Sequence, residues 1–276
     1  MQIDNVKIYA DESAEISSIG KVATGASFGV DSSYAIFTNI NKSVGKSLDY
    51  LIIVDFEREQ EALVPKIQDF ADELGIELIV VKTNAINFGI NADVLYAQNY
   101  LGSVLALQRL IGTYYYGSAY DDFKFDHEPA HFDLLSVECF SNGTTRFLSS
   151  NQAIDRPHKT EYLTKIPFTY SHLSVCADDD RKQCGRCTKC VRTQIDLDSA
   201  GCLDKYGDLF DINIYKTNRK KWLGRLMYWN GKEPFNTMSY RYAKEKGVKF
   251  PMRSYIWLGI YTLIYSIKIF FSIEQI

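Results

Sequence analysis

The sequence predicts an α/β protein built on a parallel sheet with helices on both faces. Apolar runs of strand length alternate with helical patterns along the first half of the 276-residue chain, an order that favours right-handed βαβ units. One run, Asp49–Phe56, is continuously apolar through its centre, as expected for a strand buried on both faces of such a sheet. Ligands of these sheets bind at the carboxyl ends of the strands.

The individual elements follow from local patterns. The predicted strands are Lys21–Ala26, Asp49–Phe56, Ile76–Val81 and Thr113–Tyr116. Between them, helices are expected from about Ser32, over Glu61–Leu74 with Gly75 as the C-terminal cap, and over Tyr100–Ile111 with Gly112 ending the helix. Strand, helix, strand at this spacing is typical of a parallel sheet.

Composition and charge restrict the class of protein. The chain is 46% hydrophobic and 24% charged, as is usual for a folded protein. Its first residues have neither a basic segment nor an apolar run, so no secretion signal is expected and a reducing cytoplasm fits best. Residues 1–214 carry 19 Lys and Arg against 31 Asp and Glu, whereas residues 215–276 carry 12 against 3. The tail is therefore strongly basic.

A glycine and small hydroxyl residues follow the first predicted strand, in the segment Ser27-Phe28-Gly29-Val30-Asp31-Ser32-Ser33. Between a strand and a helix, such residues allow backbone N–H groups to converge on an anion, and the helix N-terminus adds partial positive charge. The segment also fits a helix cap by Asp31 or Ser32 without any ligand.

The same segment resembles the Ser-Gly-Gly-x-Asp-Ser signature of PP-loop ATP pyrophosphatases, a family that includes GMP synthetase, tRNA-thiolating enzymes and 7-cyano-7-deazaguanine synthase. Phe28 stands where the signature has its first glycine. The resemblance implies an adenine-nucleotide α-hydrolase-like fold, cleavage of ATP between its α- and β-phosphates, and Asp31 as a catalytic carboxylate that helps to hold Mg²⁺. It implies ATP binding by Ser27, Phe28, Gly29, Val30, Asp31 and Ser32.

Three further residues fit this resemblance. Asp55, at the end of the second predicted strand, lies where the family places the adenosine, although an exposed strand-end carboxylate is equally simple. Arg156 and Lys159 resemble the stretch that supplies a phosphate-contacting lysine in these enzymes, and Lys159 is the second implied catalytic residue. An exposed lysine at a helix start is the alternative.

Four cysteines fall within fifteen residues, at Cys176, Cys184, Cys187 and Cys190. Structural zinc takes four tetrahedral N or S ligands, and two cysteines separated by two residues reach one metal, so the spacing predicts a zinc knuckle. A redox pair and an iron–sulfur cluster are the alternatives. Cys139 and Cys202 lie outside the cluster and are expected to be buried as small hydrophobes.

The segment Cys-Gly-Arg-Cys-Thr-Lys-Cys-Val-Arg-Thr is similar to the C-terminal zinc element of 7-cyano-7-deazaguanine synthases. With the loop near the start it forms a two-part signature over roughly residues 20–195, and in these relatives the zinc is structural. The expected organisation is an ATP-binding domain over residues 1–170, a zinc knuckle over 171–200 and a basic, aromatic-rich helical tail over 201–276.

The resemblance implies an AMP- and pyrophosphate-forming ligase that adenylates a carboxylate or carbonyl for attack by a nitrogen nucleophile. Its acceptor is expected to be a small molecule or nucleotide-like, with a pocket in the segment Tyr116–Phe147, which carries the polar residues Asp121, Asp122, Asp126, His127, Glu128 and His131. The histidines of this segment fit exposed loop positions at least as well. The alternatives are tRNA or nucleotide modification of the thiolation type and a non-catalytic nucleotide-binding protein.

The tail beyond Tyr215 ends in an apolar, aromatic-rich run of about 18 residues that Lys268 interrupts. Three roles stay open for it. It fits internal packing or a homodimer contact, association with an anionic membrane surface at the inner face of the membrane, and contact with RNA through the basic residues.

Overall fold

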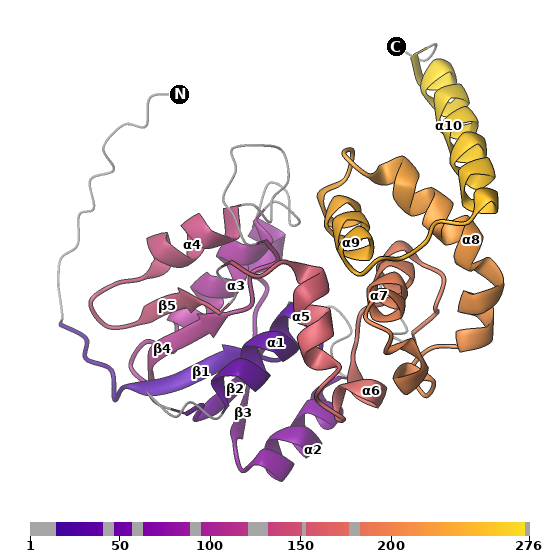
Figure 1. Ribbon diagram of the computed structural model, residues 1–276. Coiled ribbons are helices and arrows are strands. Elements are labelled where there is room, and N and C mark those ends of the chain that lie inside the picture. Colours follow the sequence, from indigo (N-terminus) through magenta and orange to yellow (C-terminus); the bar gives the residue numbers. More distant parts are fainter. Residues whose placement is uncertain are drawn as a thin grey trace.

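The computed structural model describes residues 15–40, 47–56, 63–88, 95–120, 132–150, 153–176 and 183–273. Its centre is a five-stranded, all-parallel sheet with the strand order β3-β2-β1-β4-β5 (Figure 1). The strands are β1 Lys21–Gly25, β2 Tyr50–Asp55, β3 Glu77–Lys82, β4 Ile111–Tyr116 and β5 Arg146–Ser149. The predicted α/β class with a parallel sheet is confirmed.

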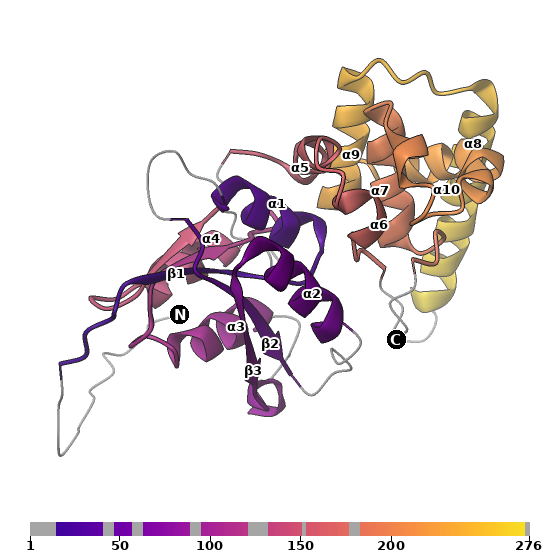
Figure 2. The same cartoon turned by 90° about the horizontal axis from the view of Figure 1, so that it is seen from below.

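Helices follow most strands and then form a separate group. The first group is α1 Val30–Asn39, α2 Val64–Leu74, α3 Tyr96–Leu105 and α4 Asp133–Phe140. The later helices are α5 Arg156–Leu163, α6 Thr169–His172, α7 Thr188–Ser199, α8 Ile212–Trp229, α9 Pro234–Glu245 and α10 Met252–Ile273, with short 3-10 helices at Ala85–Phe88 and Leu203–Tyr206. Figures 1 and 2 place α7–α10 to one side of the sheet.

Both faces of the sheet are buried under helices. On one face Leu51 and Ile53 pack with Ile36 of α1 and Phe70 of α2. On the other face Ile52 and Val54 pack with Leu101 of α3 and Val137 of α4. Alternate side chains of β2 thus serve opposite cores, which is why this strand has no polar residue before Asp55.

The first strand, β1, is at the centre of the sheet, and the order in which later strands are added across the sheet reverses once. From β1 the chain passes to β2 and β3 at one edge, then crosses to β4 and β5 at the other. The reversal separates the loops that follow β1 and β4, although these two strands are neighbours. A crevice at the carboxyl ends of the strands is expected at this switch point.

One predicted helix is wrong in extent. Tyr100–Ile111 was expected to be helical, but α3 ends at Leu105, and Gly112 lies inside β4 instead of ending a helix. A side chain on Gly112 would come within 2.7 Å of the Cα atom of Gly20, so close approach of two backbones is the reason for glycine here. By contrast Gly75, at φ +65°, caps α2 as predicted.

Helices α5 to α9 share a third core, so part of the tail belongs to it. Leu163 of α5, Cys190 of α7 and Leu223 of α8 belong to one buried cluster, which extends to Val30 at the start of α1. Ion pairs fasten the tail at the surface, with Lys246 Nζ 2.7 Å from Glu161 Oε1 and Arg219 Nε 2.7 Å from Asp198 Oδ2. Among the helices in the described ranges, none has the length and apolar character needed to cross a membrane.

Candidate functional site

The loop after β1 leads directly into α1. Gly29 is the N-cap residue with extended backbone, and within the described part of the chain no side chain caps this helix end. The first hydrogen bond of the helix joins Ser33 N to Gly29 O, so the preceding amides have no intrahelical acceptor. Ser27 Oγ and Ser32 Oγ lie 2.9 Å apart and close the loop. Neither Asp31 nor Ser32 caps the helix, and its amides are available to an anion.

Phe28 has the left-handed conformation, at φ +53°, that glycine adopts most easily. Its side chain is 2% exposed and its ring lies edge-on to Phe70 and Phe168, at 5.4 Å from each ring centre. Phe28 O accepts a hydrogen bond of 2.7 Å from Ser174 N, which ties the loop to the segment leading to the cysteines. The aromatic cage therefore holds the loop in a glycine-like shape without a glycine.

Two cations of α5 meet the carboxylate of Asp31. Asp155 caps α5 through a bond from His158 N, and the helix then carries Arg156 and Lys159 three residues apart, on one side. Arg156 Nη1 lies 2.7 Å from Asp31 Oδ2, and Lys159 Nζ lies 3.1 Å from Asp31 Oδ1. Lys159 is 0% exposed and also donates to Ser118 O at 2.8 Å. A lysine so deeply buried requires a fixed partner.

A cavity of about 360 Å³ opens at this place, between the ends of β1 and β4. Its walls come from the loop after β1, the start of α1, the end of β4, α3 and the cysteine segment. Of the residues predicted to bind nucleotide, those that line it are Ser27, Gly29, Asp31, Ser32 and Arg156. Phe28 and Val30 lie behind the loop, and Lys159 reaches the cavity through Asp31.

Tyrosines form the wall that sequence reasoning missed. The cavity is lined by Tyr96, Tyr100, Tyr114 and Tyr116. Tyr114 Oη donates to Tyr100 Oη at 3.2 Å, and Tyr100 Oη donates to Ile52 O at 3.2 Å. Burial raises the pKa of Tyr100, Tyr114 and Tyr116 above the usual phenol value, so the wall stays uncharged and aromatic. The run Tyr114–Tyr116, at the carboxyl end of a predicted strand, is the sequence feature that could have indicated this wall.

Asp55 ends β2, as the sequence predicted, but it is not among the side chains that line the cavity. The preceding residue, Val54, does line the cavity. Asp55 is only 9% exposed, and its Oδ1 has no hydrogen-bond partner within the described ranges, so it is not the exposed carboxylate of the simpler interpretation. The six polar residues of the predicted acceptor segment all lie outside the described residues: Asp121, Asp122, Asp126, His127, Glu128 and His131.

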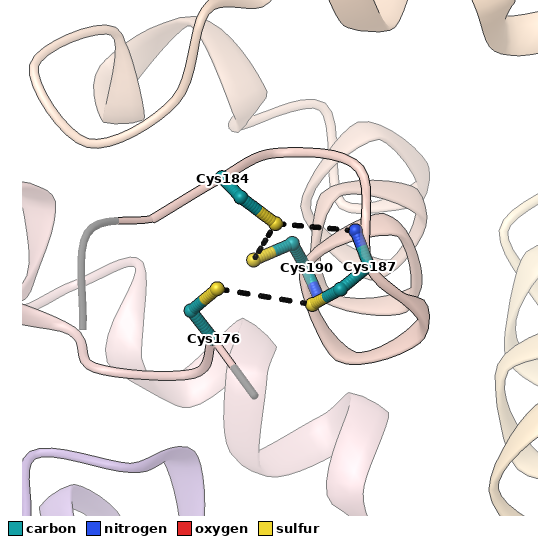
Figure 3. A group of neighbouring side chains, drawn as sticks. All are labelled: Cys176, Cys184, Cys187 and Cys190. Atoms are coloured by element: carbon teal, nitrogen blue, oxygen red, sulfur yellow. Dashed lines mark hydrogen bonds between the residues drawn. The ribbon is translucent and has the colours of Figure 1, made fainter. Parts of the chain in front are cut away.

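The four cysteines form one cluster (Figure 3). All four Sγ atoms lie within 4.8 Å of one another, and the pairs Cys176–Cys187 and Cys184–Cys190 are each 3.9 Å apart. Four sulfurs at about 2.3 Å from one tetrahedral zinc would be roughly 3.8 Å apart, so these positions fit a metal such as zinc. Amides of residues 186 and 187 point to Cys184 Sγ, as is common around metal-bound thiolates.

The cysteine cluster borders this cavity. Cys176 and Lys189 line it, beside Arg156. Burial lowers the pKa of Lys189, and the nearby cations Arg156 and Arg192 lower it further, so three cations lie close together at this side of the cavity. Cys139, expected to be buried, is instead exposed on α4, because this position faces away from the sheet, and Cys202 is partly buried.

The tail also contacts the site. Phe235, at the start of α9, contacts two guanidinium groups, with Arg192 at 4.5 Å and Arg156 at 5.5 Å from the ring centre. Its ring stacks on Tyr120 with 4.7 Å between centres. Cations over aromatic faces are attracted by the ring quadrupole, so α9 helps to orient Arg156.

No protein-family model matches this chain, and no curated protein matches it.

Proposed function

We infer that the protein is an ATP pyrophosphatase of the PP-loop type, with an adenine-nucleotide α-hydrolase-like fold, that forms AMP and pyrophosphate. One observation carries the proposal: Arg156 and Lys159 converge on Asp31 at the uncapped N-terminus of α1, at the switch point of a parallel sheet. This arrangement concentrates positive charge and amide donors beside an aromatic cavity, which suits a nucleotide with several phosphates.

Each group has a role in this proposal. The amides at the start of α1 and the hydroxyls of Ser27 and Ser32 would bind the β- and γ-phosphates, and Arg156 would neutralise charge that develops on pyrophosphate as it leaves. Lys159 holds Asp31, and we assign Asp31 as the carboxylate that would bind Mg²⁺. Mg²⁺ supplies charge neutralisation of the phosphates.

The proposed reaction is C–N bond formation like that of 7-cyano-7-deazaguanine synthase. A carboxylate or carbonyl oxygen of the acceptor attacks the α-phosphorus and displaces pyrophosphate, and a nitrogen nucleophile then displaces AMP. The cavity would fix both partners in position, which lowers the entropic cost of their reaction. Zinc on the four cysteines would be structural, because all four protein ligands fill a tetrahedral site.

Sulfur transfer of the thiolation type has less support. Of the cysteines, all of which are described, only Cys176 lines the cavity, and it belongs to the metal cluster. Cys139 is exposed on α4 and lines no part of the cavity. A persulfide mechanism requires a reactive thiol beside the acceptor.

The test is to incubate the protein with Mg²⁺, ATP labelled at the α-phosphate, ammonium and a metabolite extract, and to separate AMP from ADP. We expect AMP and pyrophosphate, reduced at least about 100-fold in Asp31→Asn, because the variant loses the carboxylate that would hold Mg²⁺ beside the phosphates. Asp69→Asn, at an exposed position of α2, is the matched control. Formation of ADP would refute cleavage between the α- and β-phosphates.

A second variant separates binding from folding. Lys159→Met keeps the buried aliphatic volume but loses the bonds to Asp31 and Ser118. Asp31 retains Arg156, so we expect a folded protein whose ATP affinity is about tenfold weaker, as for one charge-assisted bond. Titration calorimetry with ATP measures the affinity, and urea unfolding measures the stability. Unchanged ATP affinity in a folded variant would remove Lys159 from the site.

A further inference from the structure

The outer face of α10 is apolar and uncovered. Seven large apolar side chains of this helix are between 37% and 80% exposed: Met252, Tyr255, Ile256, Ile260, Leu263, Ile264 and Ile267. Most recur every three or four residues, so they line one side of the helix. Figures 1 and 2 show α10 at the margin of the molecule, beside α8. An apolar surface of this extent is unusual on an isolated domain.

The opposite side of α10 is already occupied by α8. A side chain at Gly224 of α8 would come within 2.5 Å of Trp257 and 2.6 Å of Ser254 O, so the two helices are in close contact. Further along, Tyr228 stacks on Tyr265 with 4.8 Å between ring centres. The exposed face is therefore in addition to the face that holds α10 on the protein.

Positive charge lies next to α10. Residues 246–273 contain four Lys and Arg and no Asp or Glu. Next to α10 is a groove of about 590 Å³, lined by Arg186, Lys221, Arg225 and Tyr261 and by no carboxylate of the described residues. Lys221 Nζ lies 5.3 Å from the Trp257 ring centre, and Lys268 Nζ lies 5.5 Å from that of Tyr265. Long cationic side chains thus extend along the aromatic residues of α10.

We propose that α10 lies along the surface of an anionic lipid bilayer. Its exposed face would enter the boundary between headgroups and acyl chains, and the basic groove would lie against lipid phosphates. Apolar area, interfacial Trp and Tyr, and flanking cations are the features that bind a helix to such a surface. A second copy of the chain is a poorer fit, because pairing two α10 helices in either direction brings cations together without a carboxylate from residues 246–273.

The test is co-sedimentation of the full-length protein with vesicles. One set is phosphatidylcholine alone, and the other contains about one-third phosphatidylglycerol. We expect the protein to sediment with the anionic vesicles and to bind them more weakly as salt is raised, because salt screens the headgroup charge. Equal binding to both vesicle types, or binding to neither, would overturn the proposal.

Two variants test the two halves of the surface. Ile256→Gln/Leu263→Gln should weaken vesicle binding at least tenfold, whereas Ile19→Gln, at a 70% exposed apolar position outside the tail, should not change it. Arg186→Gln/Lys221→Gln leaves the apolar face intact and should weaken binding to anionic vesicles about fivefold per cation. Circular dichroism confirms that each variant is folded.

Sedimentation velocity without lipid tests whether a second copy of the chain covers the exposed face of α10. A dimer that becomes a monomer in Ile256→Gln/Leu263→Gln, together with no vesicle binding by the wild type, would show that α10 covers a second copy and would overturn the lipid proposal. A monomer that binds anionic vesicles supports it.

Discussion

At Phe28 the loop has a backbone conformation that glycine usually provides, although the residue is not glycine. A left-handed conformation costs an ordinary residue roughly 1–2 kcal/mol, and here burial of a phenyl ring among Phe70, Phe168 and His172 offsets that cost. The backbone around Gly29 can therefore approach a phosphate as it would with two glycines. The sequence mismatch does not by itself argue against nucleotide binding.

Phe28→Gly tests this role of the phenyl ring. We expect the variant to be less stable by about 2–4 kcal/mol, since loss of a buried phenyl ring outweighs relief of backbone strain. ATP affinity should change little, because the loop already has the glycine conformation. Urea unfolding and titration calorimetry measure the two quantities, and Phe168→Leu, from the same cage, is the control for packing. A large gain in ATP affinity would mean that the phenyl ring distorts the loop.

Asp196 gives the helical region a pH dependence. Burial in α7 raises its pKa to about 7, although Arg192 and Arg156 oppose the shift. As pH rises, the unfolded chain loses this proton first, so folding is penalised increasingly from about pH 4 to 7 and the penalty is complete above pH 7.

Asp196→Asn should remove this penalty. We expect the variant to be more stable than wild type at pH 8. The difference in the free energy of unfolding should be at most about 1.4 kcal/mol for each unit by which folding raises the pKa of Asp196, and it should disappear near pH 4. Urea unfolding across that range measures the difference, with Asp69→Asn as the exposed control. A constant difference at all pH values would show that the pKa of Asp196 is the same in the folded and unfolded states.

At the scale of elements, the cysteine cluster closes the start of α7. Cys187 is the N-cap residue of this helix, and its Sγ accepts from Cys190 N at 3.5 Å. The cluster also joins α7 to the segment whose amide of Ser174 bonds the loop at Phe28. Metal binding should therefore stabilise both the helix start and the cavity wall, because the free energy of binding adds to folding.

Cys187→Ser should lose the metal and several kcal/mol of stability, with weaker ATP binding as a consequence. Elemental analysis of the purified protein and thermal unfolding measure these effects, and Cys202→Ser, outside the cluster, is the matched control. A Cys187→Ser protein with full zinc content and stability would refute the structural metal. Iron in the purified wild type would favour a cluster instead.

For the molecule as a whole, the tail is part of the core. Trp222, Leu223 and Leu226 of α8 share a buried cluster with residues of α5 and α7, whereas none of the α10 side chains that the structure describes belongs to that cluster. Phe235 of α9 meanwhile contacts Arg156 in the site. The segment that composition marks as distinct is thus joined to the region of the cavity by burial and by cation–π contacts.

Truncation separates these two parts of the tail. Deleting residues 212–276 should give an insoluble or unfolded protein, because it exposes the apolar side of α5 and α7. Deleting only residues 252–276 should leave the melting temperature within a few degrees of the full chain. Soluble yield and circular dichroism melting are the measurements. A cooperatively folded chain of residues 1–211 would refute the integral role of α8.

Local patterns were sufficient wherever a short segment determines its own structure. The apolar run of β2, the glycine cap of α2, the loop after β1 and the tight cysteine spacing could all be read from sequence, since their hydrogen bonds or ligand geometry involve near neighbours. The end of α3 could not be predicted in this way. Gly112 does not end a helix but allows close approach of the Gly20 backbone, which is more than ninety residues away in the sequence.

The parallel α/β class, the loop that leads into α1 and a group of four cysteines with the spacing of metal ligands could be predicted from the sequence alone. Only the tertiary structure brought Arg156 and Lys159 to Asp31, placed four tyrosines around the cavity, and packed α8 and α9 into the protein while leaving one face of α10 bare. The physical reason is the range of the interactions: helix caps and knuckle turns join residues a few positions apart, whereas buried ion pairs and shared cores join segments more than a hundred residues apart.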